Sequence, residues 1–380
     1  MPALLDPSAP DVAATRRPLL EAKPLAGRFF VDPEVFDLEM EVLFRRRWLC
    51  VGRETDWPEP GRLGTQEVGP ESILVVRGKG NGLRAFYNVC RHRGARLVAA
   101  GDRDRCDVIR CPYHAWTYGL DGRLLAAPLM DGRDGFDRAT VALEEVRLDT
   151  WHGFAFVNLR DDAPPLAEAL ADVPDLSRHR LGELVPCASH GYEVAANWKL
   201  LLENYSECYH CALVHPELNR ISHYLSGGKQ ECGPSFSGGP MTLNAGFNTM
   251  STSGRSERPS IDGLARDDES KVFYYAIYPH LLLSLHRDYV MTHTVWPLAP
   301  DRSRILCQWL FPATTAAAPG FDPSDAVDFW DLTNRQDWQV CERSQQGVAS
   351  RGYRPLHYQA GEGCVHAFDT WYLDSLLAGR

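Results

Sequence analysis

Two short cysteine–histidine pairs constrain this chain of 380 residues more than any other feature. Cys90 and His92 are separated by one residue in the segment CRHRG, and Cys111 and His114 by two residues in CPYHAWTYG. Each spacing fits one tight loop, and eighteen residues lie between the two pairs. We therefore expect the fold to bring the two loops together around a shared metal site.

The mixed composition of each pair indicates which metal centre this is. Two thiolates and two imidazoles suit either zinc or an iron–sulfur centre. A structural zinc finger usually places its two cysteines together, whereas here each loop holds one cysteine and one histidine. This pattern favours a [2Fe–2S] cluster with Cys90 and Cys111 on one iron and His92 and His114 on the other. Zinc is the alternative.

A second group of ligand-type side chains lies in ENYSECYHCALVHP, residues 203–216. His210 and His215 are five residues apart, about 140° around an ideal helix, so one helix face cannot present both. Pro216 disfavours helical backbone at His215, which predicts a break between the histidines. Two histidines and a distant carboxylate would leave open positions on a ferrous ion. The His-Glu-x-x-His pattern of zinc proteases is absent from the sequence.

Both groups of residues resemble the motifs of Rieske non-haem iron oxygenases, in the terminal oxygenase (alpha) subunit. The matching segments are CRHRG with CPYHAWTYGLDG, and NWK with ENYSECYH and the following histidine. The resemblance implies an α+β chain: an N-terminal all-β Rieske domain, then a helix-grip catalytic domain with a large antiparallel sheet and flanking helices. It also implies that Trp116 and Tyr113 pack against the cluster loop. Ordinary core aromatics are the alternative interpretation.

The resemblance also implies a third iron ligand, an aspartate on a late helix shortly before a Gln-x-Gly. The chain reads DLTNRQDWQVCERSQQG there, and Asp337 stands at the matching place, ten residues before Gly347. Asp331 on the same helix is the alternative ligand. A solvated aspartate with no metal is the remaining interpretation of Asp337.

Glu207 stands where most of the family has an aspartate, three residues before His210. We expect it one helical turn before that histidine, beside the iron but outside the ligand set. A metal-bound imidazole usually donates its other N–H to such an acceptor. We predict that Glu207 bridges His210 and a cluster histidine, His92 or His114, of a neighbouring subunit. A salt bridge at the subunit interface is the alternative.

The pattern along the chain predicts three regions. Residues 1–47 form an N-terminal segment with a helix, residues 48–160 the Rieske domain, and residues 161–380 the catalytic domain. The N-terminal helix is expected at 32–48, capped by Asp32, and a late helix at 324–350, capped by Ser324. Further expectations are a hairpin turn at 78–82, a short helix within 161–177, and long antiparallel strands within 273–313.

Composition excludes several classes of protein. The chain has 40 basic and 50 acidic residues, a net charge of −10, which argues against nucleic acid as a partner. No apolar run approaches the roughly 20 residues that cross a bilayer, and the N-terminus does not resemble a secretory signal. Eleven cysteines, an odd number, favour the reducing cytoplasm. We interpret Cys208 and Cys211 as buried packing residues, with a redox disulfide as the alternative.

The resemblance predicts a terminal oxygenase with one [2Fe–2S] cluster and one Fe(II) per chain. NAD(P)H is the ultimate electron donor through a separate reductase or ferredoxin, because the chain shows no nicotinamide or flavin fingerprint. Family members are commonly homotrimers in which the cluster of one subunit feeds the iron of its neighbour. The expected reaction is mono- or dioxygenation of a small organic substrate, by hydroxylation or oxidative N-demethylation. The motif around Glu207 favours a betaine-like quaternary ammonium compound. A ring-hydroxylating enzyme for an aromatic carboxylate, or a Rieske electron carrier without turnover, is the alternative.

Overall fold

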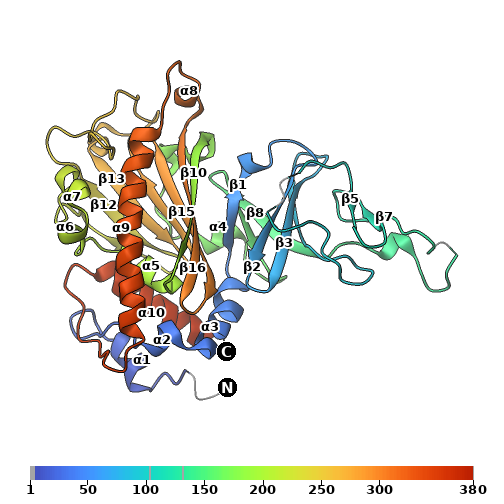
Figure 1. The fold of residues 1–380 in the computed structure, drawn as a ribbon, viewed down its shortest axis with the longest axis horizontal. Helices are drawn as coiled ribbons and strands as arrows, with labels where there is room; N and C mark the ends of the chain where they lie inside the picture. Colours follow the sequence, from blue (N-terminus) through green and yellow to red (C-terminus); the bar gives the residue numbers. More distant parts are fainter. Residues whose placement is uncertain (1–4, 102–103, 131, 380) are drawn as a thin grey trace. The chain divides into compact units, whose positions relative to one another are not determined.

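The computed structural model describes residues 5–101, 104–130 and 132–379, and its contacts divide the chain into two compact units (Figure 1). One unit spans Phe44–Ala169, and the other combines Met1–Leu43 with Leu170–Arg380. The N-terminal segment therefore packs with the later part of the chain and not as a region of its own. Among the described residues, no helix is both long and apolar enough to cross a membrane.

The unit at residues 44–169 is built from antiparallel strands, as predicted. Its larger sheet has the order β1-β9-β8-β4-β3-β2, and a smaller sheet has the order β5-β6-β7. The strands are β1 (Leu49–Arg53), β2 (Leu63–Val68), β3 (Glu71–Arg77), β4 (Leu83–Tyr87), β5 (Ile109–Arg110), β6 (Thr117–Tyr118), β7 (Leu124–Ala126), β8 (Glu145–Trp151) and β9 (Phe154–Asn158). The predicted turn at 78–82 joins β3 to β4, and the Gly78 amide donates to the Gly82 carbonyl at 2.9 Å.

The second unit contains one seven-stranded antiparallel sheet with the order β10-β16-β15-β14-β13-β12-β11. Its strands are β10 (Leu184–Val194), β11 (Glu231–Cys232), β12 (Phe236–Thr242), β13 (Lys271–Ile277), β14 (Leu281–Leu285), β15 (Val290–Ala299) and β16 (Arg302–Pro312). Strands β13–β16 confirm the prediction of long antiparallel strands within 273–313. Most of the apolar side chains of these strands are buried, so this sheet forms the centre of the unit.

Helices pack on this sheet, and the long helix α9 runs across it (Figure 1). The helices of the chain are α1 (Pro10–Thr15), α2 (Arg28–Val31), α3 (Pro33–Glu39), α4 (Leu166–Ala169), α5 (Trp198–Tyr205), α6 (Cys211–Val214), α7 (Pro216–Ile221), α8 (Ala313–Ala316), α9 (Ser324–Val348) and α10 (Gly363–Ala378). Helix α4 belongs to the unit at 44–169 and is the predicted short helix. Helix α5 lies against both α9 and β15, which places the chain segment that follows it near α9.

Two helix ends differ from the sequence prediction. Asp32 caps α3 as expected, by accepting from the Glu34 amide at 2.9 Å, but the α-helix stops at Glu39 and continues as a π-helical turn to Phe44. Ser324 is the first residue of α9 and does not cap it. Asp322 accepts the Ser324 amide at 2.9 Å and its hydroxyl at 2.8 Å, so the carboxylate takes the role predicted for the serine.

A buried polar cluster anchors α5. The ammonium of Lys199 lies 2.6 Å from Glu39, and both side chains are fully buried. Glu39 also accepts from the Trp198 indole at 2.7 Å and from the Tyr372 hydroxyl at 2.5 Å. A buried charge is tolerated only when it is paired and hydrogen-bonded, and here one carboxylate from α3 satisfies groups on α5 and α10. The N-terminal segment therefore helps to fix the helix that leads into the 203–216 segment.

Candidate functional site

The two cysteine–histidine loops lie together in the unit at 44–169. Cys90 follows β4, and Cys111 and His114 lie on the loop between β5 and β6. Each loop is closed by a backbone hydrogen bond to its cysteine carbonyl, from Gly94 at 3.0 Å and from Ala115 at 3.2 Å. Both closing residues have positive φ, 72° and 59°, which such a tight reversal requires. The local sequence thus produces the two adjacent loops that the motif predicts.

The thiols and imidazoles of this group face different surroundings. Cys90 and Cys111 are each 2 % exposed and belong to the apolar core of the unit, whereas His92 is exposed. The His92 and His114 rings lie 4.7 Å apart between centroids, so the two imidazoles converge. Two neighbouring thiols on an apolar floor and two converging imidazoles above them fit the ligand set of a [2Fe–2S] cluster with mixed ligation.

Aromatic residues support these loops. Trp116 stacks on His92 with ring centroids 4.8 Å apart and planes 5° apart, and Tyr113 stacks on His114 at 3.7 Å. The packing against the loop that the resemblance implied is therefore present. Tyr118, which sequence reasoning missed, has its hydroxyl 3.3 Å from the Cys90 sulfur and accepts the Arg91 amide at 3.1 Å. Its place seven residues after Cys111, in WTYG, was the available signal.

The second ligand group forms in the other unit, where His210, His215 and Asp337 converge. The Nε2 atom of His215 lies 2.8 Å from Asp337 Oδ1, and Nε2 of His210 lies 3.2 Å from the same oxygen. Asp337 comes from the middle of α9, whereas the histidines flank the short helix α6. Three donor atoms that point at one place, two imidazole nitrogens and one carboxylate oxygen, fit a mononuclear iron site with open positions.

The backbone explains how two histidines five residues apart meet. His210 immediately precedes α6 and His215 follows it, with φ −123° and ψ 71°, outside helical values. Pro216 then begins α7. The helix break predicted from Pro216 is therefore present, and it turns both rings toward α9.

Glu207 contacts His210, although not from a helix. Helix α5 ends at Tyr205, and Glu207 lies in the turn before α6, so the prediction of a position one helical turn away is wrong. Its Oε2 accepts the backbone amides of Tyr209 and His210, which fixes the turn. Its Oε1 lies 2.5 Å from Nδ1 of His210, so the carboxylate holds the ring nitrogen that faces away from Asp337.

The pKa values of Asp337 and His210 depend on each other through their hydrogen bond. Burial raises the pKa of Asp337, but hydrogen bonds from His210 and His215 outweigh burial and lower it. Burial lowers the pKa of His210, and its hydrogen bonds to Asp337 and Glu207 outweigh that effect and raise the pKa to about 10. The carboxyl group of Asp337 is therefore held as an anion beside the imidazoles, the form in which a carboxylate binds iron.

Two further side chains orient the histidines, and no sequence pattern indicated either of them. Gln336 Oε1 lies 2.7 Å from Nδ1 of His215, and Asn204 Nδ2 lies 3.4 Å from Nε2 of His210. Gln336 directly precedes Asp337, so that adjacency was the only available signal. Asp331, the alternative ligand, is turned elsewhere: it accepts from Tyr192 at 2.7 Å and from Arg335 at 2.7 Å.

A cavity of about 420 Å³ opens beside these ligands. Glu207, His210, His215 and Asp337 all line it, so the ligand group occupies one wall. Its aromatic lining residues are Tyr205, Tyr209, Tyr224, Tyr274 and Trp330. The rings of Tyr274 lie 6.1 Å from Tyr205 and 6.4 Å from Trp330 between centroids, which makes a continuous aromatic wall. Among the described residues, no lysine or arginine lines the cavity.

Comparison with known proteins matches both units. The model of the "Ring hydroxylating alpha subunit (catalytic domain)" family matches residues 181–378, and that of the "Rieske [2Fe-2S] domain" family matches residues 47–145. The glycine betaine monooxygenase oxygenase subunit of Chromohalobacter salexigens is 32 % identical, covering 92 % of this chain and 85 % of the relative. The chain belongs to the Rieske oxygenases, as an alpha subunit.

Another relative and a solved structure agree with the assignment of this chain to the Rieske oxygenases. The carnitine monooxygenase oxygenase subunit of Escherichia coli K12 is 29 % identical, covering 88 % of this chain and 86 % of the relative. The crystal structure of a quaternary ammonium Rieske monooxygenase shares the fold, with a TM-score of 0.80 at 24 % identity over 95 % of this chain and 97 % of that one. The two matched families imply a [2Fe–2S] cluster and a mononuclear iron, and an oxygenase subunit implies a reductase partner.

Cys208 and Cys211 of the oxygenase form a disulfide, so their interpretation as packing residues is wrong. The turn before α6 brings their Cα atoms to 5.0 Å, within the range that a disulfide bridges. The same turn carries Glu207 and His210. Local backbone geometry, which the spacing alone does not determine, decides this pairing.

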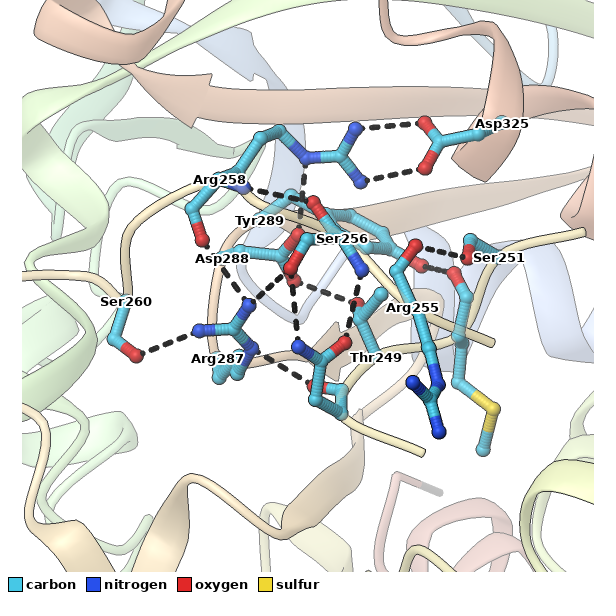
Figure 2. A network of polar contacts seen from close by, with 12 residues as sticks. Thr249, Ser251, Arg255, Ser256, Arg258, Ser260, Arg287, Asp288, Tyr289 and Asp325 are labelled. Carbon is cyan, nitrogen blue, oxygen red and sulfur yellow. Dashed lines mark hydrogen bonds and ion pairs between the residues drawn. The ribbon is translucent and has the colours of Figure 1, made fainter. Parts of the chain in front are cut away.

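A polar network around Arg258, Arg287 and Asp288 lies in the catalytic unit of the oxygenase (Figure 2). Trp330 donates its indole N–H to the Tyr289 hydroxyl at 2.7 Å, and Tyr289 donates to the Met250 carbonyl at 2.6 Å. Arg258 makes two hydrogen bonds to Asp325, at 2.7 Å and 3.1 Å, and one to Asp288 at 3.0 Å. Arg287 donates to four oxygens of the segment 248–260. These bonds fasten that segment to the β14–β15 turn and to α9, and thereby position the indole of Trp330.

Proposed function

We propose that this oxygenase hydroxylates or oxidatively N-demethylates a small quaternary ammonium compound of the betaine type. One observation carries the proposal: the cavity beside His210, His215 and Asp337 has an aromatic wall and no lysine or arginine among its described lining residues. The named activities of the relatives, on glycine betaine and on carnitine, agree with that chemistry.

The cavity lining suits a methylated ammonium group. Such a group cannot donate a hydrogen bond from its nitrogen and is held mainly by the faces of aromatic rings. Tyr205, Tyr274 and Trp330 provide those faces in the cavity that the ligand group also lines. The carboxylates of Glu207 and Asp337 add negative charge, which favours a cationic substrate.

The aromatic-carboxylate alternative has less support. A carboxylate in a buried site normally requires a cationic partner or several hydrogen-bond donors. The described lining offers neutral donors, such as Gln230 and Gln359, but no guanidinium or ammonium group. A betaine carboxylate would rely on these neutral amides.

The residues of this chain would divide the work as follows. His210, His215 and Asp337 would hold one Fe(II), whose chemistry is to activate dioxygen. Gln336 fixes the ring of His215 by accepting its Nδ1–H, and Glu207 accepts Nδ1–H of His210. Cys90, His92, Cys111 and His114 would hold one [2Fe–2S] cluster, which supplies electrons one at a time. The apolar surroundings of Cys90 and Cys111 keep water from that side.

We further propose a homotrimer in which Glu207 connects the two kinds of metal centre across a subunit interface. Large apolar side chains are exposed at both centres, Tyr113 at 59 % beside His114, and Tyr209 at 63 % and Leu213 at 89 % beside Glu207. Exposed apolar groups next to functional residues mark interaction surfaces. In this arrangement His92 or His114 of a neighbouring subunit donates to Glu207. The electrons come from NAD(P)H through a separate reductase or ferredoxin.

The electron-carrier alternative predicts a different metal content. A carrier needs only the unit at 44–169 and would bind two irons per chain. The second unit would hold a third iron per chain, through His210, His215 and Asp337. The composition of the sequence further leads us to propose a cytoplasmic location.

The experiment combines the holoenzyme with a reductase and compares glycine betaine, carnitine, choline and benzoate for product formed per dioxygen consumed. The sharpest control is the neutral carbon isostere of choline, in which carbon replaces the quaternary nitrogen. It has the same shape but no cation–π attraction, so we expect its KM to rise by about tenfold. Tyr274→Leu should raise KM for the ammonium substrate, and Tyr274→Phe, which keeps the ring, should not. Coupled turnover of benzoate with none of any ammonium compound would reject the proposal.

A further inference from the structure

A second pair of cysteines lies at the edge of the same cavity, outside both metal-ligand groups. Cys232 ends the two-residue strand β11, and Cys364 is the second residue of helix α10. They are 132 residues apart in the sequence, yet their sulfur atoms are 3.6 Å apart. Cys364 lines the cavity and is 1 % exposed, whereas Cys232 is exposed.

The two thiols have different reactivity. The hydrogen bond from Cys364 lowers the pKa of the Cys232 thiol, and the same contact, together with burial, raises the pKa of Cys364. Cys232 is therefore the sulfur that is both more readily ionised and open to solvent. A thiolate is the form that reacts with oxidants, and a second thiol in contact with it can complete a disulfide.

The backbone permits the bond to close. A disulfide needs a sulfur–sulfur distance of about 2.05 Å, so the pair must approach by roughly 1.5 Å. Strand β11 is the last strand of the seven-stranded sheet, and in the described part of the chain its one neighbour in that sheet is β12. A short edge strand held on one side moves more easily than a central strand.

We propose that Cys232 and Cys364 form a reversible disulfide site that hydrogen peroxide oxidises. The Cys232 thiolate attacks peroxide, so an S–O bond forms, the O–O bond breaks, and the leaving oxygen departs as water after taking a proton. The Cys364 sulfur then attacks the sulfenic acid, so the S–S bond forms, the S–O bond breaks, and a second water leaves. Two electrons pass from the two sulfurs to peroxide, and a dithiol reductant returns them.

The bond would join two walls of the cavity. Gln230, two residues before Cys232, lines the cavity, and so do Gln359 and Gly361, shortly before Cys364. Oxidation fastens the first segment to the second and removes the freedom of the edge strand. This contrasts with Cys208–Cys211, which is already a disulfide directly after Glu207 in the sequence and crosslinks only its own turn.

The test uses purified holoenzyme, reduced and then exposed to equimolar hydrogen peroxide, with free thiols alkylated before peptide mass spectrometry. We expect a crosslinked peptide pair that contains Cys232 and Cys364 and is lighter by two hydrogens. Cys232→Ser and Cys364→Ser should not give it, and a dithiol should reverse it. Cys187→Ser is the matched control, because Cys187 is a half-buried thiol whose hydrogen bond goes to the Val185 carbonyl. Cys232 should be consumed about tenfold faster than Cys187, whose pKa burial raises.

A second readout measures the effect on the cavity wall. Amide hydrogen exchange of residues 227–233 should slow by about tenfold on oxidation in the wild-type protein and remain unchanged in Cys232→Ser. Accumulation of Cys232 sulfinic acid with Cys364 still free would overturn the proposed disulfide. A crosslink without slower exchange would overturn its effect on the wall. Neither readout uses turnover, so both results stand apart from the identity of the substrate.

Discussion

The proposed cluster region and the proposed iron region expose opposite parts of their ligand sets. In the unit at 44–169 the two thiols are buried in an apolar core, and His92 projects into solvent. In the other unit His215 is 2 % exposed and His210 16 %, and both rings line an internal cavity. An electron-transfer centre needs one face within reach of another protein, whereas an oxidation site must hold substrate and restrict water.

The neighbouring residues follow the same division. The proposed cluster histidines, His92 and His114, are supported by the stacked aromatic rings of Trp116 and Tyr113. The iron histidines are held by polar groups of their own unit, Glu207 and Gln336. We therefore expect the proposed cluster site to be accessible to a partner protein, and the histidines of the proposed iron site to be held rigidly by their own unit. Four substitutions test this difference.

The largest effect is expected for Asp337→Asn. Loss of the anionic oxygen that faces both His210 and His215 should lower mononuclear iron by about tenfold or more and abolish detectable product. Cluster absorbance should remain unchanged, because its ligands belong to the other unit. Asp331→Asn on the same helix is the control and should keep its iron. Loss of iron in the control, with retention in Asp337→Asn, would assign the ligand to Asp331.

Glu207→Gln tests whether the two regions communicate through this carboxylate. The amide keeps the size of the side chain but removes the negative charge that accepts from His210. We expect both metals to be retained and the cluster still to be reduced by the reductase. Single-turnover oxidation of the cluster by dioxygen and substrate should slow by about a hundredfold. If Glu207→Ala keeps full coupled turnover, the electron path does not include Glu207.

Gln336→Ala tests the support behind His215. Removal of the oxygen 2.7 Å from Nδ1 frees the ring to rotate, so we expect iron affinity to fall by about tenfold, as measured by competition with a chelator. Gln339→Ala, an exposed glutamine one turn along α9, is the matched control. Equal iron affinity in both variants would show that packing alone orients His215.

Tyr118→Phe tests the buried side of the cluster and should have the smallest effect. The hydroxyl lies 3.3 Å from the Cys90 sulfur, and hydrogen bonds to cluster sulfurs raise the reduction potential. The midpoint potential should therefore become more negative in a redox titration, without loss of iron or change of fold. A potential that does not move would mean that the Tyr118 hydroxyl serves only the Arg91 amide.

The sequence predicted those parts of both sites that are local. Cys90 with His92, and Cys111 with His114, lie on loops whose short spacing already dictates a tight turn. His210 and His215 are separated by a helix break that Pro216 predicts. The all-β region also follows from alternation of apolar residues, because a half-buried strand imposes a period of two. Asp337 required the family resemblance, because its own helix offers several acidic residues.

Only the tertiary structure decided which distant residues meet. Asp337 reaches His215 across 122 residues, and Cys232 reaches Cys364 across 132, with no spacing in the sequence to indicate either pair. Glu39 in the N-terminal segment neutralises Lys199 from 160 residues away, so residues 1–43 belong with the later unit. Local spacing determines what a single turn can present, because backbone geometry acts over a few residues. Contacts between turns depend on how helices and sheet pack, and that packing results from the summed burial of many side chains.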